Sequence, residues 1–401
     1  MSSHTTHEVE YATVRVVEAG ADQIYIAADV PEEPADADAA CRAIYQAIAE
    51  TLGRRGAEVV HERVFGSMEA CAPVSDARAA ALKDCEVDPA TPVSYIQGTP
   101  PWGTGLAGVL LHAVRSPDGA RPPWTCFHEG APCGRAWERN GATFLLLQGF
   151  HGLPKQPSGD RPSREAQALQ MFDHAGGALQ SNGASYRDVV RTWIYLPEIL
   201  EWYGDFNRVR NEKYDSLGLM PDLDAAAGPN EVALPASTGI QGANIAGAAC
   251  IMDLLAVGGA DGERVQTSLM TNEKQLDAFR YGAAFSRAAC VREPDVTRVF
   301  VSGTAAIDEE GKSLYPGDAK RQIRRTLENV AALVDEAGGA LSDLCDACLF
   351  LKRAEDVSAY RDVADELGLG NMPAVCMVAD VCRAELLFEI DGVAVIPADR
   401  S

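Results

Sequence analysis

The sequence predicts an α+β fold of three tandem modules, each a sheet with helices on one face, which together form an internal pseudo-trimer. One order of patterns is repeated: an apolar strand leads to a helix, a Gly-containing turn and a second apolar strand. Its clearest copies run over 143–218 and 297–368. The spacing is shared as well, because Gly149 and Asp188 in one copy are nearly as far apart as Gly303 and Asp343 in the other. Repetition at this scale indicates similar modules, so binding sites are expected between them.

The N-terminal module is predicted over 9–115, after a flexible tail at 1–8. A strand-like run at 23–28 precedes a helix over 38–52 and a further strand over 55–65. This copy of the pattern is the faintest. A purely structural role is one interpretation of the module, because it supplies none of the ionisable motifs described below.

The middle module is predicted over 136–258. Its strand at 144–149 leads to a helix over 165–179, and a second strand follows at 192–196. Within this module, as in the others, the order of strand pair, helix, strand, helix and strand is the pattern of a sheet covered by helices on one face.

The C-terminal module is predicted over 263–401, with strands at 298–303 and 347–351. Apolar residues recur at three- and four-residue steps along its first helix, at Ile323, Leu327, Val330 and Val334. This periodicity is typical of an amphipathic helix that packs on a sheet.

Three segments are predicted to connect modules: 115–135, 222–229 and 258–262. The first is rich in aromatic residues around 122–130, so we expect it to pack against a module. Each sheet keeps one face free of its own helices. Packing three such faces together buries their apolar surface at about 25 cal/mol per Å², which is the reason to expect a pseudo-trimer.

Composition narrows the function. With 47% apolar and 23% charged residues the chain is an ordinary globular protein, and its net charge of −23 argues against nucleic acid as a partner. A small anionic substrate remains compatible, because distant charges are screened beyond about 8 Å. The absence of a membrane-spanning run or signal peptide predicts a cytoplasmic protein, and the eleven irregularly spaced cysteines are expected to be free thiols.

Glu389 is the first candidate for chemistry. It lies within the apolar run 386–396, and by period-two alternation it shares a face with Leu387 and Asp391. Burial of a carboxyl group raises its pKa toward a value useful for a general acid. The alternative is an edge strand whose acidic face meets solvent.

The C-terminal module resembles the Rid (YjgF) family, whose homotrimers carry small-molecule sites in clefts between subunits. The matching residues are Val301-Ser-Gly303, Gln322, Leu327-Glu-Asn329, Ala337-Gly338, Met372-Pro-Ala374 and Phe388-Glu-Ile-Asp-Gly-Val-Ala394. In the imine-deaminating members an arginine follows the Pro-Ala step and holds the substrate carboxylate, whereas Val375 follows it here. Because the guanidinium fork is missing, the resemblance implies the Rid fold without ordinary Rid deaminase activity.

Over most of its length the chain is more similar to the chorismatases, which resemble a Rid trimer fused into one polypeptide. The matching stretches, in order, are 98–103, 202–210, 234–240, 281–287 and 380–391. This resemblance implies a cofactor-independent enzyme of secondary metabolism. Its substrate would be chorismate, a small anion, and its products pyruvate and 3-hydroxybenzoate or a dihydroxycyclohexadiene carboxylate. It also implies a catalytic role for Glu389 and a site between the middle and C-terminal modules.

The substrate's two carboxylates require cations, for which the candidates are Arg191, Arg210, Arg287 and Arg383. At least two of them are expected to face the ligand, because two carboxylates in a low-dielectric cleft must be neutralised. Surface or structural arginines are the alternative for each.

Further substrate-binding candidates are Tyr203, Tyr281, Ser237 and Thr238, which offer hydroxyl or backbone donors. Core tyrosines and a plain turn are the alternatives. By resemblance, Cys382 as a second catalytic residue together with Gly303 indicates the 3-hydroxybenzoate-forming subclass. The alternative for Cys382 is an inert buried thiol.

Two rival functions remain: a Rid-type imine or enamine hydrolase, or a related biosynthetic enzyme, and a non-catalytic ligand-binding pseudo-trimer. A metal site is not expected, because Cys345 and Cys348 have no second Cys or His pair nearby. No cofactor and no membrane partner are expected, and the protein is predicted to be a monomer or a weak homo-oligomer.

Overall fold

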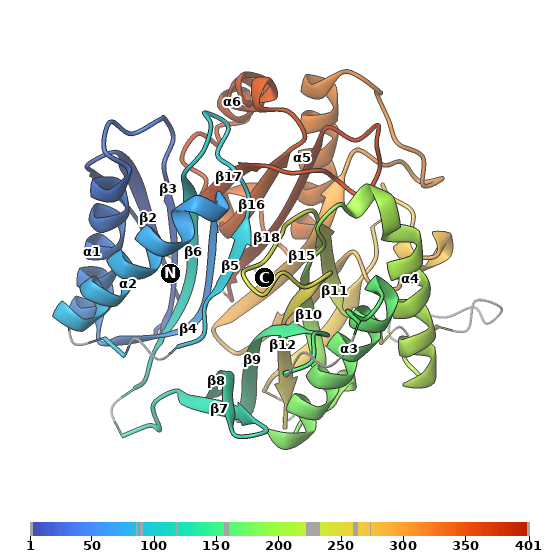
Figure 1. Ribbon diagram of the computed structural model, residues 1–401, viewed down its shortest axis with the longest axis horizontal. Helices are drawn as coiled ribbons and strands as arrows, with labels where there is room; N and C mark the ends of the chain where they lie inside the picture. The colour runs from blue at the N-terminus through green and yellow to red at the C-terminus, as the bar shows by residue number, and fades with distance from the viewer. Residues whose placement is uncertain are drawn as a thin grey trace.

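The predicted α+β class of three tandem modules is confirmed by the computed structural model, which contains three six-stranded sheets with the same topology (Figure 1). The structure describes residues 3–85, 87–88, 91–117, 119–155, 160–221, 233–259, 264–272 and 274–398. The expected connection at 222–229 and most of that at 258–262 lie outside the described residues.

The N-terminal sheet has the strand order β1-β2-β3-β6-β4-β5. Its strands are β1 (Ser3–Val9), β2 (Ala12–Ala19), β3 (Gln23–Asp29), β4 (Ala57–Gly66), β5 (Ser94–Gln97) and β6 (Leu106–Arg115), and its helices are α1 (Ala37–Arg55) and α2 (Cys71–Asp84). The expectation of a tail at 1–8 is wrong for the described part of that segment. Strand β1 pairs antiparallel with β2 as an exposed edge strand, for which its β-branched threonines are suited.

The middle sheet has the order β11-β10-β12-β9-β8-β7. Its elements are β7 (Trp124–His128), β8 (Ala131–Arg139), β9 (Ala142–His151), α3 (Arg164–Ser181), β10 (Val189–Tyr195), α4 (Ile199–Ser216), β11 (Ala236–Ile240) and β12 (Ile251–Gly258). Strand β7 comes from the aromatic segment that was expected to pack against a module, and it begins ahead of residue 136.

The C-terminal sheet has the order β13-β14-β15-β18-β16-β17. Its elements are β13 (Gln266–Met270), β14 (Ala288–Arg292), β15 (Val296–Ala305), α5 (Ala319–Glu336), β16 (Leu344–Leu351), α6 (Val357–Glu366), β17 (Ala374–Val378) and β18 (Phe388–Pro397). Each module therefore places its last long strand, β6, β12 or β18, in the interior of its sheet.

Side chains that cap backbone N–H groups mark where helices begin in all three modules. Asp36 accepts from Ala39 N at 2.8 Å before α1, and Ser163 accepts from Ala166 N at 3.2 Å before α3. Asp318 caps α5 in the same way. These short polar residues satisfy N–H groups that have no partner within the first turn.

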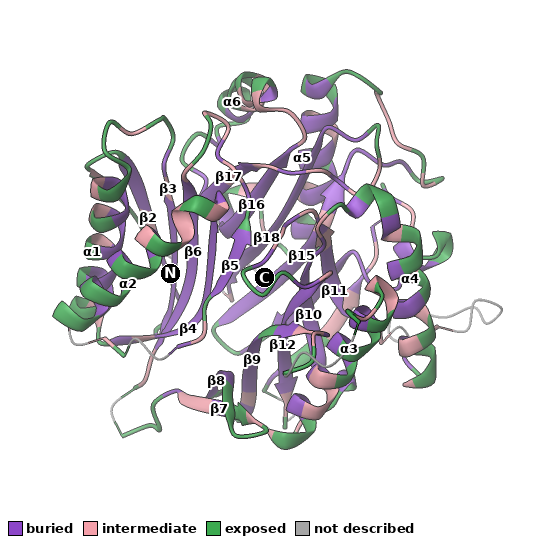
Figure 2. Ribbon diagram, in the orientation of Figure 1, coloured by how far each residue is buried: buried purple, intermediate pink, exposed green. Residues whose placement is uncertain are grey.

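The apolar core is divided between a shared centre and three outer layers. Each outer layer joins one sheet to its own two helices, whereas the central cluster draws Val17, Phe65, Trp193, Phe300 and Phe350 from all three modules. Figure 2 shows the buried strands at the centre and the exposed faces of the helices outside. This arrangement is the expected internal pseudo-trimer.

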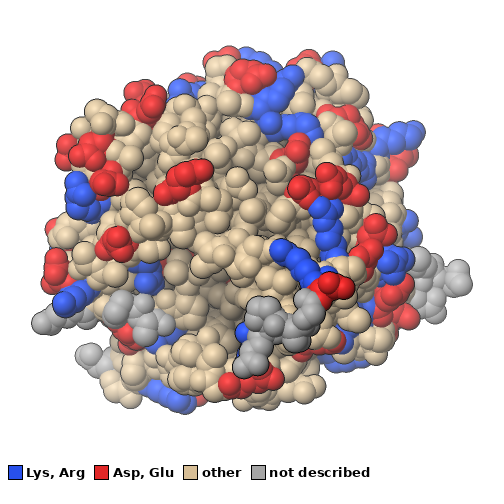
Figure 3. Space-filling view, in the orientation of Figure 1, with Lys and Arg blue, Asp and Glu red and all other residues tan. Residues whose placement is uncertain are grey.

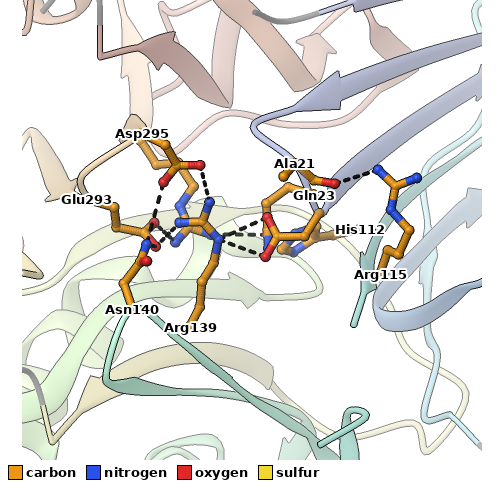
Figure 4. Close-up of polar contacts among 10 residues, drawn as sticks. Ala21, Gln23, His112, Arg115, Arg139, Asn140, Glu293 and Asp295 are labelled. Carbon is orange, nitrogen blue, oxygen red and sulfur yellow. Dashed lines mark hydrogen bonds and ion pairs between the residues drawn. The ribbon is translucent and has the colours of Figure 1, made fainter. Parts of the chain in front are cut away.

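Ionic contacts also join the modules. Arg139, at the end of β8, pairs with Asp22 of the N-terminal module and with Glu293 and Asp295 of the C-terminal module (Figure 4). Because an unpaired buried charge is costly, these partners favour one relative placement of the three modules.

The outer surface mixes both signs of charge. On the face in Figure 3, basic side chains are interspersed with acidic ones. Among the described residues, no helix has the length and apolar character required to cross a membrane.

Candidate active site

A cleft between the middle and C-terminal modules brings together most of the candidate residues. Its cavity of about 260 Å³ is lined by Tyr203, Asn207, Ser237, Gly239, Tyr281, Ala283, Phe285, Arg287, Gly303, Ala305, Ile307, Cys382, Arg383 and Glu389. Helix α4 and strand β11 form one wall, and the C-terminal module forms the other. We call this the Glu389 cleft.

A second cavity, of about 320 Å³, lies between the C-terminal and N-terminal modules. It is lined by α6 and β17 on one side and by Arg15 and Asp29 on the other, and we call it the Asp29 cleft. We assign the candidate site to the smaller Glu389 cleft because of the ionisable groups described next.

Glu389 lies on an interior strand, which excludes the alternative of an acidic edge strand. It is 4% exposed and pairs with Ala305 of β15 and Phe350 of β16. Burial, followed by the nearby charge of Asp391, raises the pKa of Glu389 to about 8, against smaller opposing effects of Arg287 and Arg191. The carboxyl group therefore carries a proton at neutral pH and can act as an acid.

Gly303 makes room for this carboxyl group. The pairing of β15 with β18 shifts between Val301 and Thr304, which is a bulge beside the site. A Cβ atom at Gly303 would collide with Oε1 of Glu389. The glycine therefore leaves room for the end of the Glu389 side chain, and no positive φ angle requires it.

Two arginines line the cleft without a carboxylate partner in the described part of the chain. Arg287 is 1% exposed and donates to the backbone oxygen of Leu276 and to Tyr281 Oη at 3.0 Å. Arg383 donates to the backbone oxygen of Gly311 at 2.8 Å. Both guanidinium groups lie near the Tyr281 ring, at 5.5 and 5.2 Å from its centroid. Their charges are available to an anion.

Arg210 lies behind the lining of the cleft. It is 1% exposed, donates to Asn207 Oδ1 at 2.6 Å and packs near the rings of Phe206 and Phe285. It too has no ion-pair partner among the described residues. Buried cations normally have an anionic partner. Because no described carboxylate offsets the charge of Arg210, it adds positive potential to the wall that Asn207 and Phe285 form.

Arg191 and Thr238 do not line the cavity. Arg191 donates to Thr238 Oγ1 at 2.5 Å and to Asp391 Oδ2 at 3.1 Å, and all three side chains are buried beneath the cleft. The buried carboxylate and hydroxyl occupy this guanidinium, so it does not reach the cavity.

The remaining candidates do line the cavity. Removal from water, followed by the effect of Glu389, raises the pKa of the Cys382 thiol to about 12, so the group is not a thiolate nucleophile. Burial also raises the pKa of Tyr203, which stays a neutral hydroxyl. Ser237 accepts a hydrogen bond from Thr192 at 2.8 Å.

Several lining residues were not among the candidates, namely Asn207, Gly239, Ala283, Phe285, Ala305 and Ile307. Asn207 and Phe285 belong to stretches that match the chorismatases, so those matches carried a usable signal. Gly239 and Ala283 lie in such stretches as well, whereas Ala305 and Ile307 lie outside them and carried no signal. In the part of the chain that the structure describes, no group of three or more His, Cys, Asp or Glu residues could hold a metal ion.

The fold and the cleft define a class of protein: tandem modules of one α+β type with a cavity between two of them. The endoribonuclease L-PSP family model matches residues 277–396. A RutC family protein from Pyrococcus abyssi is 31% identical over 97 residues, which are 24% of this chain and 76% of that protein. The chain belongs to the RutC family.

The longer matches are to chorismatases, which confirms the resemblance expected from the sequence. A chorismatase from Streptomyces rapamycinicus is 29% identical over 291 residues, 66% of this chain and 78% of that protein. A 3-hydroxybenzoate synthase from Streptomyces hygroscopicus is 30% identical over 237 residues, which are 52% of this chain and 64% of that protein. A crystal structure of a chorismatase shares the fold, with a TM-score of 0.58 and 19% identity over 84% of this chain and 93% of that one.

Proposed function

We propose that the protein is a chorismatase, which releases pyruvate from chorismate in the Glu389 cleft. The observation that carries the proposal is the pairing of a buried carboxyl group of raised pKa with arginines that have no carboxylate partner among the described residues. This combination suits a dianion whose reaction begins with protonation. The chorismatase and 3-hydroxybenzoate synthase relatives support the same substrate.

Arg287 and Arg383 are proposed to bind the two carboxylates of the substrate, with Arg210 adding positive charge from behind the wall. Guanidinium groups bind carboxylates through paired hydrogen bonds, and such bonds are strong in a cleft shielded from water. Tyr203, Tyr281, Ser237 and Asn207 would hydrogen-bond the ring hydroxyl and the remaining carboxylate oxygens.

Glu389 is proposed to donate its proton to the methylene carbon of the enolpyruvyl group. The double bond supplies the electron pair for the new C–H bond, which leaves an oxocarbenium-like centre at the ether carbon. If water attacks that centre, the bond between the ether oxygen and that carbon breaks, and pyruvate leaves with the dihydroxycyclohexadiene carboxylate, which loses water to become 3-hydroxybenzoate. If the neighbouring ring hydroxyl attacks, the same bond breaks, but the carbon stays attached to the ring through the attacking oxygen. The bond between that oxygen and the ring then breaks and the adjacent ring carbon loses its proton, so that pyruvate and 3-hydroxybenzoate form together. The carboxylate left on Glu389 recovers a proton from the attacking group. The reaction needs a proton donor and no electron carrier, so we propose that it proceeds without a cofactor.

The ring product is proposed to be 3-hydroxybenzoate. Cys382 and Gly303 both line the cleft beside Glu389, which is the combination that by resemblance belongs to the 3-hydroxybenzoate-forming subclass. The atoms of chorismate equal those of pyruvate and 3-hydroxybenzoate together, so this route consumes no net water. A dihydroxycyclohexadiene carboxylate would contain one added water.

A Rid-type imine hydrolase fits the structure less well. Val375, which replaces the carboxylate-binding arginine of that activity, is fully buried, and its Cγ2 lies 2.7 Å from where a Cβ of Gly108 would be. That position is packed between modules and has no room for a substrate anchor.

The test is to incubate the purified protein with chorismate and follow pyruvate by a coupled assay and the ring product by mass. Pyruvate with 3-hydroxybenzoate is the expected result. Pyruvate with the diene would retain the reaction and reject the subclass. A protein that leaves chorismate intact would reject the proposed function.

We further propose a cytoplasmic location in secondary metabolism, for which the eleven free cysteines and the Streptomyces relatives are the support. A monomer or weak homo-oligomer is proposed because the three sheet faces already cover one another within a single chain.

A further inference from the structure

A buried cluster of charges connects the N-terminal module to the strand that carries Glu389. It contains Arg63 of β4, Arg191 of β10, Thr238 of β11, Asp346 of β16 and Asp391 of β18. We call it the Asp391 cluster. Each of the three modules contributes to it, whereas none of the described residues of the N-terminal module lines the Glu389 cleft.

Arg63 is the member that comes from the N-terminal module. Its guanidinium group lies 2.6 Å from Asp346 Oδ1 and 3.9 Å from Asp391 Oδ1. On the other side of Asp391, Oδ2 accepts from Thr238 Oγ1 at 2.6 Å and from Arg191 at 3.1 Å. The Asp391 carboxylate is thus held between two arginines.

The cluster touches the Glu389 cleft through two residues. Asp391 follows Glu389 by two positions on β18, so the two carboxyl groups share one face of the sheet. Thr238 donates to Asp391, and its methyl group lies 3.4 Å from where a Cβ of Gly303 would be, beside Glu389. A change in the charge of Asp391 is therefore transmitted to Glu389 over a short distance.

Stability alone is a poor reason for such a cluster. The Arg63 and Asp391 side chains are 1% and 0% exposed. Buried ion pairs are often no more stable than well-packed apolar residues, because both charges lose their hydration. The cluster is also incompletely bonded: Nε of Arg63 and Oδ1 of Asp391 have no hydrogen-bond partner among the described residues.

We infer that Arg63 and Asp391 are positioning residues for Glu389, through which the N-terminal module takes part in a reaction whose cleft its described residues do not line. Arg63 holds Asp391 in place and offsets part of its negative charge, and the remaining charge of Asp391 keeps the proton on Glu389. This inference rests on the proposed function for the role of Glu389 in turnover, although the proton affinity of Glu389 can be measured without it.

Other charged and titratable groups also face Glu389, and they limit how far a change at Asp391 can shift the pKa of Glu389. They are Arg287, Arg383, Cys382 and Tyr281 of the C-terminal module and Tyr203 and Arg191 of the middle module. Arg287 and Arg191 oppose Asp391, so removal of the Asp391 charge leaves two cations to favour the ionised form of Glu389.

The experiment is a pH titration of the Glu389 carboxyl by its infrared band in the protonated form, assigned by the loss of that band in Glu389→Gln. Asp391→Asn is expected to lower the titration midpoint by about one pH unit or more. The effect of Arg63 is measured in an Asp346→Asn background, because removing Arg63 alone would leave the Asp346 carboxylate without its ion-pair partner. Compared with Asp346→Asn alone, Arg63→Met/Asp346→Asn is expected to raise the midpoint by about half a unit or more, since a cation is lost.

A second, milder variant guards against variants that do not fold. Thr238→Val removes a single hydroxyl and nearly preserves volume, and it is expected to raise the midpoint because Asp391 loses its closest donor. Midpoints that coincide with the wild-type value while only the melting temperature changes would reduce Arg63 and Asp391 to structural residues and overturn the inference. In the same proteins the alkaline limb of kcat/KM with chorismate should follow the infrared midpoint. Absence of turnover in the wild type would reject the proposed function and leave the infrared test of the cluster intact.

Discussion

The Glu389 cleft and the Asp29 cleft are built from equivalent strand positions but distribute their charges differently. Glu389 pairs with Ala305 and Phe350 across the C-terminal sheet, and at the equivalent step Gly108 pairs with Asp29 and Phe65 across the N-terminal sheet. The carboxyl group therefore lies on the interior strand β18 in one cleft and on the neighbouring strand β3 in the other.

Each of the two clefts also has an arginine at an equivalent position of its sheet. In the C-terminal sheet, Arg287 immediately precedes the residue that pairs with Val301, and Val301 pairs with Gly392, three positions after Glu389. In the N-terminal sheet, Arg15 immediately precedes the residue that pairs with Ile26, and Ile26 pairs with Leu111, three positions after Gly108. Arg15 forms an ion pair with Asp29. Arg287 has Ala305 in the place of that aspartate and forms no ion pair in the described part of the chain. Moving one carboxyl group to the adjacent strand thus converts a closed ion pair into a free cation beside a protonated acid.

The largest expected effect separates the two clefts by their carboxyl groups. Glu389→Gln should reduce kcat for pyruvate release by about a thousandfold or more, because a positioned general acid contributes roughly 10²–10⁴. Asp29→Asn is the matched control and should keep kcat within about twofold of the wild type. Comparable losses in both variants would mean that the clefts do not differ in the way we propose.

The arginines allow the second comparison. Arg287→Met is expected to lower kcat/KM for chorismate by about a hundredfold, because loss of a guanidinium from a buried carboxylate pair typically costs 2–5 kcal/mol. Arg15→Met, at the equivalent position, should leave kcat/KM nearly unchanged. Steady-state measurement of kcat/KM for both variants is the test. A loss of kcat/KM in Arg15→Met alone would show that the active site is the Asp29 cleft.

A smaller effect is expected from Gly303→Ala. Its new Cβ would displace the end of the Glu389 side chain rather than backbone, so the fold should survive while the acid is misplaced. We expect kcat to fall about tenfold, since small displacements of reacting groups are costly. A far-UV circular dichroism spectrum equal to that of the wild type is the control, and unchanged kcat would show that the close approach of Gly303 and Glu389 has no catalytic consequence.

The comparison also shows what the sequence could predict. The carboxyl group of Glu389 could be selected from the sequence, because it interrupts an apolar run that predicts a buried strand. The structure confirms that this strand, β18, lies between two others. The repeated spacing of strands and helices was sufficient to predict three similar modules. The free state of Arg287 was not predictable, because it depends on which residue faces it after a bulge shifts the register between Val301 and Thr304.

Contacts between modules were the other feature that the sequence could not predict. Asn207 and Phe285 are far apart in the chain and meet only where the middle and C-terminal modules pack. Arg191 was a reasonable substrate ligand by its position on β10, yet Asp391 of another module occupies its guanidinium group. Arg63 offered no signal at all, because its partners come from a sheet that the sequence pattern does not connect to β4.

Stability gives a last test, in which the same chemical change should have opposite signs in the two clefts. The pKa of Glu389 is about 8 in the folded chain against 4.5 for the unperturbed group, so between these pH values the folded state binds more protons than the unfolded state. Stability therefore falls as pH rises through this window, and Glu389→Gln removes that loss. At pH 9 the variant should be more stable than the wild type by up to about 5 kcal/mol, with the difference vanishing below about pH 5. Asp29→Asn should instead destabilise the protein at neutral pH, because it leaves Arg15 without the carboxylate that neutralises it in a largely buried site. Burial outweighs Arg15 and raises the pKa of Asp29 as well, so this loss of stability should become smaller as pH rises. Melting temperatures of both variants between pH 5 and 9 provide the measurement, and a Glu389→Gln difference that does not change with pH would show that this carboxyl group is ionised in the folded protein.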